Sequence, residues 1–281
     1  MLEQIVHLWM FGPVPLADAL GALARTGADG VDLSVSLQSP HNNLEVLNRA
    51  DSLKTLADSG LPVRVVTPLY KLPVLDFSHP LADVQQTVVN FTNSCIDLAC
   101  KVGASRVLLA PSYIGPDCRL HCSYEEDWRQ AVLGLRQVAA HAEKQGVRLM
   151  LEPINRYMVT LVHTVAEGLR MIEEVGSSAL CLVPDTFHMN IEEEGGVLGG
   201  IAAAKGHIGC LHVGDNNRKP PGFGAMDWPA ILHALALAGF DGPLSHEPVA
   251  LYYRENAMAE SRRKEQFIAS LAESIRSLRM D

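Results

Sequence analysis

The chain has no uninterrupted apolar run of the 18 or more residues, roughly, that a membrane-spanning helix needs. Its first residues, MLEQIVHLWMFG, lack the charged start and the cleavage site of a secretory signal. From these two absences we expect a soluble, cytoplasmic protein with no membrane partner. Six cysteines in 281 residues do not form a disulfide framework, so we expect reduced thiols.

The cysteines fall into two groups. Four lie within apolar helix or strand patterns, which predicts buried thiols: Cys95, Cys100, Cys181 and Cys210. The other two flank the segment Cys118-Arg-Leu-His121-Cys122. A tetrahedral zinc site needs a second pair of ligands at matching spacing, and none is near. We therefore interpret this segment as a loop with two free thiols.

Positive charge is also scarce, because 23 Lys and Arg residues stand against 32 Asp and Glu residues for a net charge of −9. Such a balance disfavours a surface that neutralises nucleic-acid phosphates. No GxGxxG segment or P-loop follows the first apolar run, which disfavours a dinucleotide site. The expected partner is a small molecule and not a nucleic acid.

What the sequence does contain is a regular alternation of short β-branched or leucine-rich runs with helical patterns. The predicted strands cover residues 5–10, 30–35, 62–67, 105–110, 147–152, 179–185, 208–213 and 242–247. The main predicted helices cover residues 16–26, 81–102, 124–145, 165–175, 228–238 and about 255–278. Eight strand-helix units at this length predict a single α/β domain over residues 1–281, a closed (β/α)8 TIM barrel.

The longest connections, residues 69–80, 112–123 and 215–226, all follow predicted strands. Loops in that position surround the active site of a barrel. The acidic run at residues 192–194 is interpreted as a solvated loop or a helix start and not as a second metal site.

Four residues of metal-ligand type stand at the ends of apolar runs: Glu152 in LMLEP, Asp185 in CLVPDT, His212 in GCLHVGD and Glu247 in PLSHEP. They are roughly 30 residues apart, the length of one strand-helix unit. Since a strand buried on both faces tolerates charge poorly, metal coordination is a reason for their presence. Three carboxylates and one imidazole suit Mn²⁺, Co²⁺ or Mg²⁺ better than a thiolate-rich structural zinc site, with catalytic Zn²⁺ left open.

Three carboxylates around a divalent cation leave one negative charge, so positive or hydrogen-bonding groups should lie nearby. His188 in DTFH and Arg218 in DNNR follow the second and third ligands and are expected to contact substrate oxygens. His7, an isolated histidine within the first predicted strand, is interpreted as a further substrate-pocket residue.

Glu152 and Glu247 come from the fifth and eighth predicted strands and would approach the metal from well-separated directions. A 2-keto sugar bound between them would have a carboxylate on each face of its C3. One glutamate could remove a proton, and the other could return one from the opposite face, which inverts the carbon. Return of the proton to the neighbouring carbon would instead give aldose-ketose isomerisation, and the residues alone leave both open.

At LEPINRY, VPDTFHMNIEE and HVGDNNRKPPGFGAMDW the chain resembles the sugar isomerase/epimerase superfamily with a xylose-isomerase-like barrel. It is most similar to the ketose 3-epimerases and the keto-uronate epimerases of that superfamily. The resemblance implies that the four ligands bind one divalent metal, usually Mn²⁺, with Glu152 and Glu247 also the acid-base pair. His188 and Arg218 match substrate-contacting positions.

One position departs from the family pattern. The motif usually reads E-P-L-N-R-Y-E, whereas this chain ends it with Met158. The missing carboxylate normally helps to hold the substrate, so we predict that Met158 contacts an altered substrate, either a keto acid or a differently substituted ketose.

Several alternatives stay open at this stage. They are an aldose-ketose isomerase of the hydroxypyruvate isomerase kind, an inosose dehydratase and a catalytically silent sugar-binding barrel. A DNA-repair endonuclease of the same superfamily is disfavoured, because the predicted strand ends LSVS, VVTP and LLAP offer no further zinc ligands. Lys71, Arg156, Arg218 and Lys219 leave a phosphorylated substrate open, and a homo-oligomer is also left open.

Overall fold

The computed structural model describes residues 1–248 and 261–280 of the chain. Its strands are β1 (Gln4–His7), β2 (Gly30–Val35), β3 (Val63–Pro68), β4 (Arg106–Leu109), β5 (Arg148–Leu151), β6 (Leu180–Leu182), β7 (Leu211–Val213) and β8 (Leu244–His246). All pair in parallel in the order β6-β5-β4-β3-β2-β1-β8-β7. Isolated parallel bridges, Leu182 to Ile208 and Asp185 to His212, join the two ends of this order. The strands therefore close into the predicted (β/α)8 barrel.

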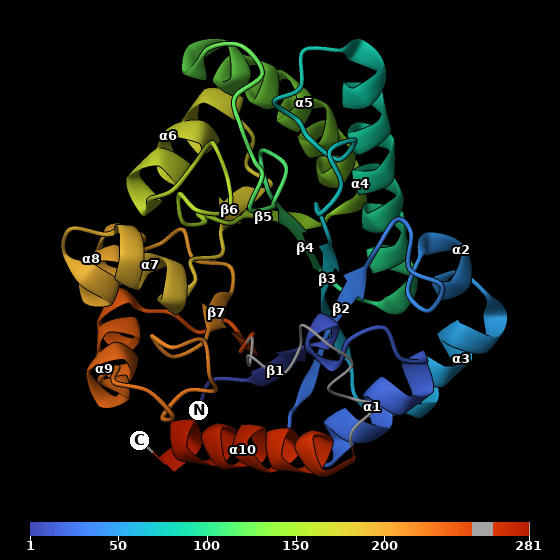
Figure 1. The fold of residues 1–281 in the computed structure, drawn as a ribbon, viewed down its shortest axis with the longest axis vertical. Helices are drawn as coiled ribbons and strands as arrows, with labels where there is room; N and C mark the ends of the chain where they lie inside the picture. Colours follow the sequence, from blue (N-terminus) through green and yellow to red (C-terminus); the bar gives the residue numbers. More distant parts are fainter. Residues whose placement is uncertain (249–260, 281) are drawn as a thin grey trace.

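Helices surround the barrel on its outside (Figure 1). The larger ones are α1 (Leu16–Ala24), α3 (Ala50–Asp58), α4 (Ala82–Val102), α5 (Tyr124–Gln145), α6 (Val165–Val175), α8 (Gly196–Ala203), α9 (Trp228–Ala238) and α10 (Ser261–Met280). Shorter ones are the 3-10 helix η1 (Leu8–Phe11), α2 (Leu44–Leu47) and α7 (Thr186–Glu192). Within the described residues, no helix has the combined length and apolar character needed to cross a membrane.

The strands are buried on both faces because side chains fill the barrel interior and helices cover the exterior. Every residue of β1, β2, β6, β7 and β8 is buried. On α4, Val88, Phe91, Cys95 and Leu98 recur at steps of three or four residues and are buried, so they form one covered face of the helix. Positive φ angles at Gly103 and Gly146 end α4 and α5, so that the chain turns back into the next strand.

Several boundaries differ from those the sequence predicts. The first strand ends at His7 and not at residue 10, because its pairing with β2 stops at His7, and His7 Nδ1 accepts the backbone N–H of Trp9 in η1. Helices α2, α3, α7 and α8 were not predicted. The described part of the last helix begins at Ser261, and its predicted start near residue 255 lies outside the described residues.

Two predictions about single residues were wrong. Cys100 is exposed on the last turn of α4 and is not a buried thiol. Glu192 is not solvated, because its carboxylate accepts hydrogen bonds from the backbone N–H and the guanidinium of Arg156 and only 8% of the residue is exposed. This pair ties the end of α7 to the loop after β5.

Candidate metal centre

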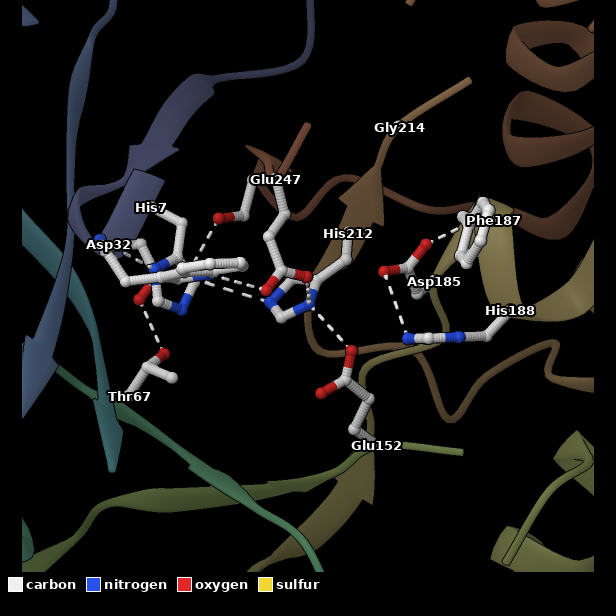
Figure 2. A network of polar contacts seen from close by, with 12 residues as sticks. His7, Asp32, Thr67, Glu152, Asp185, Phe187, His188, His212, Gly214 and Glu247 are labelled. Carbon is white, nitrogen blue, oxygen red and sulfur yellow. Dashed lines mark hydrogen bonds and ion pairs between the residues drawn. The ribbon is translucent and has the colours of Figure 1, made fainter. Parts of the chain in front are cut away.

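The four predicted ligands converge at the carboxyl ends of the strands (Figure 2). Glu152 directly follows β5, Glu247 directly follows β8, His212 lies within β7, and Asp185 is the N-cap of α7. One candidate ligand atom from each residue lies within 4.8 Å of those of the other three. The close approach arises because parallel strands deliver residues at their ends to one rim of the barrel.

His212 is at the centre of this quartet. Its Nδ1 lies 2.9 Å from Oε1 of Glu152 and 3.1 Å from Oε2 of Glu247. Its Nε2 points the other way and lies 3.7 Å from Oδ2 of Asp32. The nitrogen that faces the carboxylates is therefore the one placed to bind a cation.

Asp32 was not identified from the sequence. It is fully buried on β2 and accepts hydrogen bonds from Thr67 Oγ1 at 2.6 Å and from Ser245 Oγ at 2.8 Å. These bonds hold its carboxylate behind the imidazole of His212, an arrangement that orients metal-binding histidines in other proteins. The sequence signal that could have identified Asp32 is an acidic residue in the middle of the apolar run GVDLSV.

The environments of the two glutamates move their pKa values in opposite directions. Burial raises the pKa of Glu152 to about 7, more than the neighbouring His212 lowers it. Burial acts on Glu247 in the same direction, but Arg218 and His212 outweigh it and hold the pKa of Glu247 well below its usual range. Burial opposes a charge on His212 as well, yet the carboxylates of Glu152 and Glu247 outweigh this and raise the pKa of His212.

The donor set fits a divalent cation. Three buried carboxylates and an imidazole nitrogen share a small volume, and such a concentration of negative charge requires a compensating positive charge. Oxygen-rich ligands with one imidazole bind hard or borderline divalent ions.

Arg218 supplies part of the positive charge. Its Nη1 donates to Oδ2 of Asp185 at 2.5 Å, and its Nη2 donates to Oε2 of Glu247 at 3.1 Å. A divalent cation together with this guanidinium would neutralise the three carboxylates. Arg218 has a φ of 59°, the left-handed region that costs a non-glycine residue energy.

The loop after β7 is built to hold Arg218 in that conformation. The carboxylate of Asp215 accepts hydrogen bonds from the backbone N–H groups of Asn216, Gly222 and Met226 and from the indole of Trp228. These bonds cross the whole loop and close it upon itself.

His188 lies beside Asp185, with its Nε2 3.8 Å from Oδ2 of that residue (Figure 2). Burial lowers the pKa of His188 to about 4, so the ring is neutral near pH 7. The side-chain amide of Asn155 lies 2.7 Å from Nδ1 and donates to it, which leaves the proton on Nε2. Asn155 was not identified from the sequence, although it belongs to the motif LEPINRY.

One further residue missed by the sequence reasoning contacts Glu247. Trp9 donates its indole N–H to Oε1 of Glu247 at 2.7 Å, and the ammonium of Lys71 lies 3.9 Å from the centroid of the Trp9 ring. Trp9 lies within residues 5–10, which the sequence analysis interpreted as a strand.

The quartet opens into a cavity of about 480 Å³. The cavity is lined by both glutamates of the quartet and by all four residues predicted to contact substrate: His7, Met158, His188 and Arg218. Each of the three long loops contributes to it, through residues such as Lys71, Ile114 and Arg218. Among the cations considered for a phosphate, Arg156 instead pairs with Glu192, and Lys219 is not a lining residue.

The fold and this buried quartet define the class of the protein. Residues 20–271 match the family model described as xylose isomerase-like TIM barrel, and the chain belongs to that family. Its homologues include ketose 3-epimerases and a 3-dehydro-D-guloside 4-epimerase.

The chain is 41% identical to a D-psicose 3-epimerase of Ruminiclostridium cellulolyticum over 122 residues, which are 43% of this chain and 41% of that protein. It is 36% identical to an L-ribulose 3-epimerase of Mesorhizobium japonicum over 194 residues, 69% of this chain and 64% of that one. The matched regions thus span about two fifths to two thirds of these relatives. A solved L-ribulose 3-epimerase is 28% identical with a TM-score of 0.77, covering 100% of this chain and 98% of that chain.

Proposed function

We propose that the protein is a metal-dependent epimerase that inverts a carbon next to the carbonyl of a ketose or a keto sugar acid, with C3 as the expected carbon. The observation that carries this proposal is the meeting of Glu152 and Glu247 at His212 Nδ1, at the base of the cavity. We further propose Mn²⁺ as the bound ion, held by Glu152, Asp185, His212 and Glu247.

The two glutamates have the properties of an acid-base pair. Glu247 is held ionised by Arg218 and Trp9 and can accept a proton from the substrate carbon. Glu152 is the second carboxylate, with its Oε1 2.9 Å from His212 Nδ1, and is placed to return a proton to the same carbon. Without a metal, burial raises its pKa to about 7. Delivery from a second carboxylate on the other face of the substrate inverts the carbon, and the reverse reaction exchanges the two roles.

The remaining polar groups are placed to hold substrate oxygens. A divalent ion bound by the quartet supplies positive charge near the carbonyl oxygen and so makes the neighbouring C–H more acidic. His188 offers a neutral Nε2–H beside this position, and Arg218 offers a guanidinium. Both groups stabilise negative charge that develops on oxygen as the proton leaves.

The relatives support the same chemistry. D-psicose and L-ribulose 3-epimerases and the 3-dehydro-D-guloside 4-epimerase, by their names, all invert a carbon adjacent to a carbonyl. The last is 24% identical to this chain over 243 residues, 84% of this chain and 88% of that one.

The test is incubation of the Mn²⁺-loaded protein with candidate keto sugars in D₂O, followed by removal of the paramagnetic ion and proton NMR. Deuterium incorporation with inversion next to the carbonyl is the expected result. Formation of an aldehyde would identify an isomerase, and lasting loss of water would identify a dehydratase. Absence of exchange with every keto sugar would refute the proposal and indicate a sugar-binding barrel.

The matched variants are Glu152→Gln and Glu247→Gln. Each should lower the exchange rate by a factor of roughly 10² to 10⁴, the usual contribution of a general acid or base. Metal content is measured in the same samples, so that loss of a proton carrier is separated from loss of the ion.

A further inference from the structure

The cavity has two chemically different sides. Five of its polar side chains belong to the quartet or lie beside it: His7, Glu152, His188, Arg218 and Glu247. The side formed by β4 and by the loops after β3, β4 and β5 is apolar, and α7 extends it. We call this side the apolar wall: Tyr70, Leu108, Ile114, Ile154, Met158 and Ile191.

The polar groups next to the apolar wall are engaged elsewhere. The Tyr70 hydroxyl lies 3.1 Å from Thr92 Oγ1, and Thr67 donates its hydroxyl to Asp32 at 2.6 Å. Asn155 donates its amide to His188 and accepts the Tyr157 backbone N–H at 3.1 Å. The hydroxyl proton of Thr67 is thus directed away from the wall, and the Asn155 amide keeps one N–H on a residue that is only 3% exposed.

Two other hydrogen-bond donors, Lys71 and Tyr157, line the cavity outside the apolar wall. Lys71 lies against Trp9, on the Glu247 side. Tyr157 is 69% exposed and lies at the cavity mouth. Neither alters the apolar character of the surface around Ile114 and Met158.

The apolar wall is fixed by backbone hydrogen bonds between loops. The Ile114 N–H donates to the carbonyl of Tyr70 at 2.8 Å, and the Gly115 N–H donates to the carbonyl of Met158 at 2.9 Å. Three loops are thus joined at the wall, which is a built surface and not a chance gathering of exposed side chains.

Such a surface selects against hydroxyl groups. A sugar hydroxyl placed on the wall gives up hydrogen bonds to water, which is unfavourable. Among the six wall side chains only Tyr70 has a polar group, and its hydroxyl already lies 3.1 Å from Thr92 Oγ1. A methyl, alkyl or aryl group at the same place buries apolar surface, which is favourable. The position where the family motif has a carboxylate is here the thioether of Met158, which is at the wall itself.

We propose that the substrate is a keto sugar that carries an apolar group, such as the methyl of a deoxy sugar or an alkyl or aryl aglycone, on the part that faces Ile114 and Met158. This inference rests on the proposed function for the identity of the reacting carbon. The cavity limits the size and shape of the apolar group, and the quartet holds the reacting end of the substrate.

The experiment measures binding to the Mn²⁺-loaded protein by calorimetry with matched pairs of ligands. The pairs are D-fructose and 1-deoxy-D-fructose, L-tagatose and its 6-deoxy analogue, and 3-keto-D-glucose and its methyl glycoside. We expect the apolar member of at least one pair to bind about tenfold more tightly, the usual effect of one methyl-sized group in an apolar pocket. Equal or tighter binding of the hydroxylated member in all three pairs, or no binding of any ligand, would overturn the inference.

Variants of the wall provide the control. Met158→Glu should abolish the preference or reverse it, whereas Met158→Leu, which keeps the wall apolar, should retain it. A preference unchanged in Met158→Glu would refute the role of this wall. Ile114→Asn is a second polar variant, on a different loop, in case Met158→Glu does not fold.

These measurements distinguish failure of the apolar-wall inference from failure of the proposed epimerase function. Calorimetry needs no proton transfer, so a preference for the apolar ligands without deuterium exchange supports the wall and refutes the proposed epimerase. Exchange with a preference for the hydroxylated ligands supports the epimerase and refutes the wall.

Discussion

Trp9 and Glu247 are 238 residues apart in the sequence, and the Trp9 indole N–H lies 2.7 Å from Oε1 of Glu247. The other oxygen of this carboxylate, Oε2, faces His212 Nδ1 and Arg218 Nη2, each at 3.1 Å. Both oxygens of Glu247 are thus engaged by donors. The contacts hold the carboxylate ionised and in one orientation, as the proposed base requires.

Trp9→Phe removes the indole donor and keeps an aromatic ring under Lys71. We expect the pKa of Glu247 to rise toward its usual value, because one hydrogen bond to the charged form is lost. The exchange rate should fall by about tenfold, the size expected for one charge-assisted bond. The measurement is the pH profile of C–H exchange, whose acidic limb should move to higher pH; an unmoved limb would refute this role of Trp9.

Asp32→Asn tests the residue behind His212. The change removes the negative charge 3.7 Å from His212 Nε2 while keeping the shape of the side chain. We expect Mn²⁺ affinity, measured by calorimetry, to fall by a factor of about 10 to 100, as for other residues that orient a metal-binding histidine. Ser245→Ala, which removes only one of the bonds to Asp32, is the control and should have a smaller effect.

Metal binding should release protons near pH 7. The pKa values of Glu152 and His212 are both raised, so the metal-free quartet holds at least one proton that an ion must displace. Mn²⁺ affinity should therefore fall as the pH is lowered through 7. Calorimetry in two buffers of different ionisation enthalpy measures the released protons, and identical heats in both would contradict the prediction.

The same shifts predict how the stability of the metal-free protein depends on pH. Glu152 has a folded pKa of about 7 against the ordinary 4.5, so between these values the folded state binds more protons than the unfolded state. The contribution of Glu152 to the free energy of unfolding should decrease as pH rises through this window, and His212 continues the trend above pH 6.5. Glu247, whose pKa is lowered, acts in the opposite sense below pH 4.5. Burial lowers the pKa of His188 to about 4 and that of His246 to about 3, and these two groups act in the opposite sense below pH 6.5. The contribution of Glu152 is therefore measured in denaturant titrations of the wild-type protein and Glu152→Gln at pH 5 and 7.5 with a chelator. The free energy of unfolding of the wild-type protein relative to the variant should decrease between these pH values, and no decrease would contradict the prediction.

Substitution of two glycines by alanine tests how closely the barrel is packed around each of them. A Cβ on Gly30, at the start of β2, would lie 2.7 Å from the backbone oxygen of Pro62, which cannot move freely. Gly30→Ala should lower the free energy of unfolding by about 1 to 3 kcal/mol. Gly21, within α1, has open space around it, so Gly21→Ala should raise that free energy by up to about 1 kcal/mol. Denaturant unfolding measures both, and a loss of stability in Gly21→Ala would contradict the packing described.

Much of the barrel was predictable because its signals are local. The ranges of α5, α6 and α9 agree with the predicted helices, since each has apolar periodicity and a glycine directly after its last turn. The short helices α2 and α7 were missed because they have too few residues to show a period. Cys100 was misjudged because an apolar pattern does not reveal which face of a helix turn is covered.

The sequence by itself determined the class of fold and the four candidate ligands. Strand-helix units of nearly constant length bring residues at successive strand ends to one rim, so spacing along the chain is enough to predict that Glu152, Asp185, His212 and Glu247 meet. Only the tertiary structure decided how the two glutamates differ and what the cavity wall is made of. Trp9 and Asp32 reach the quartet from distant segments, and pKa values and pocket polarity depend on such short distances through space, which no local pattern records.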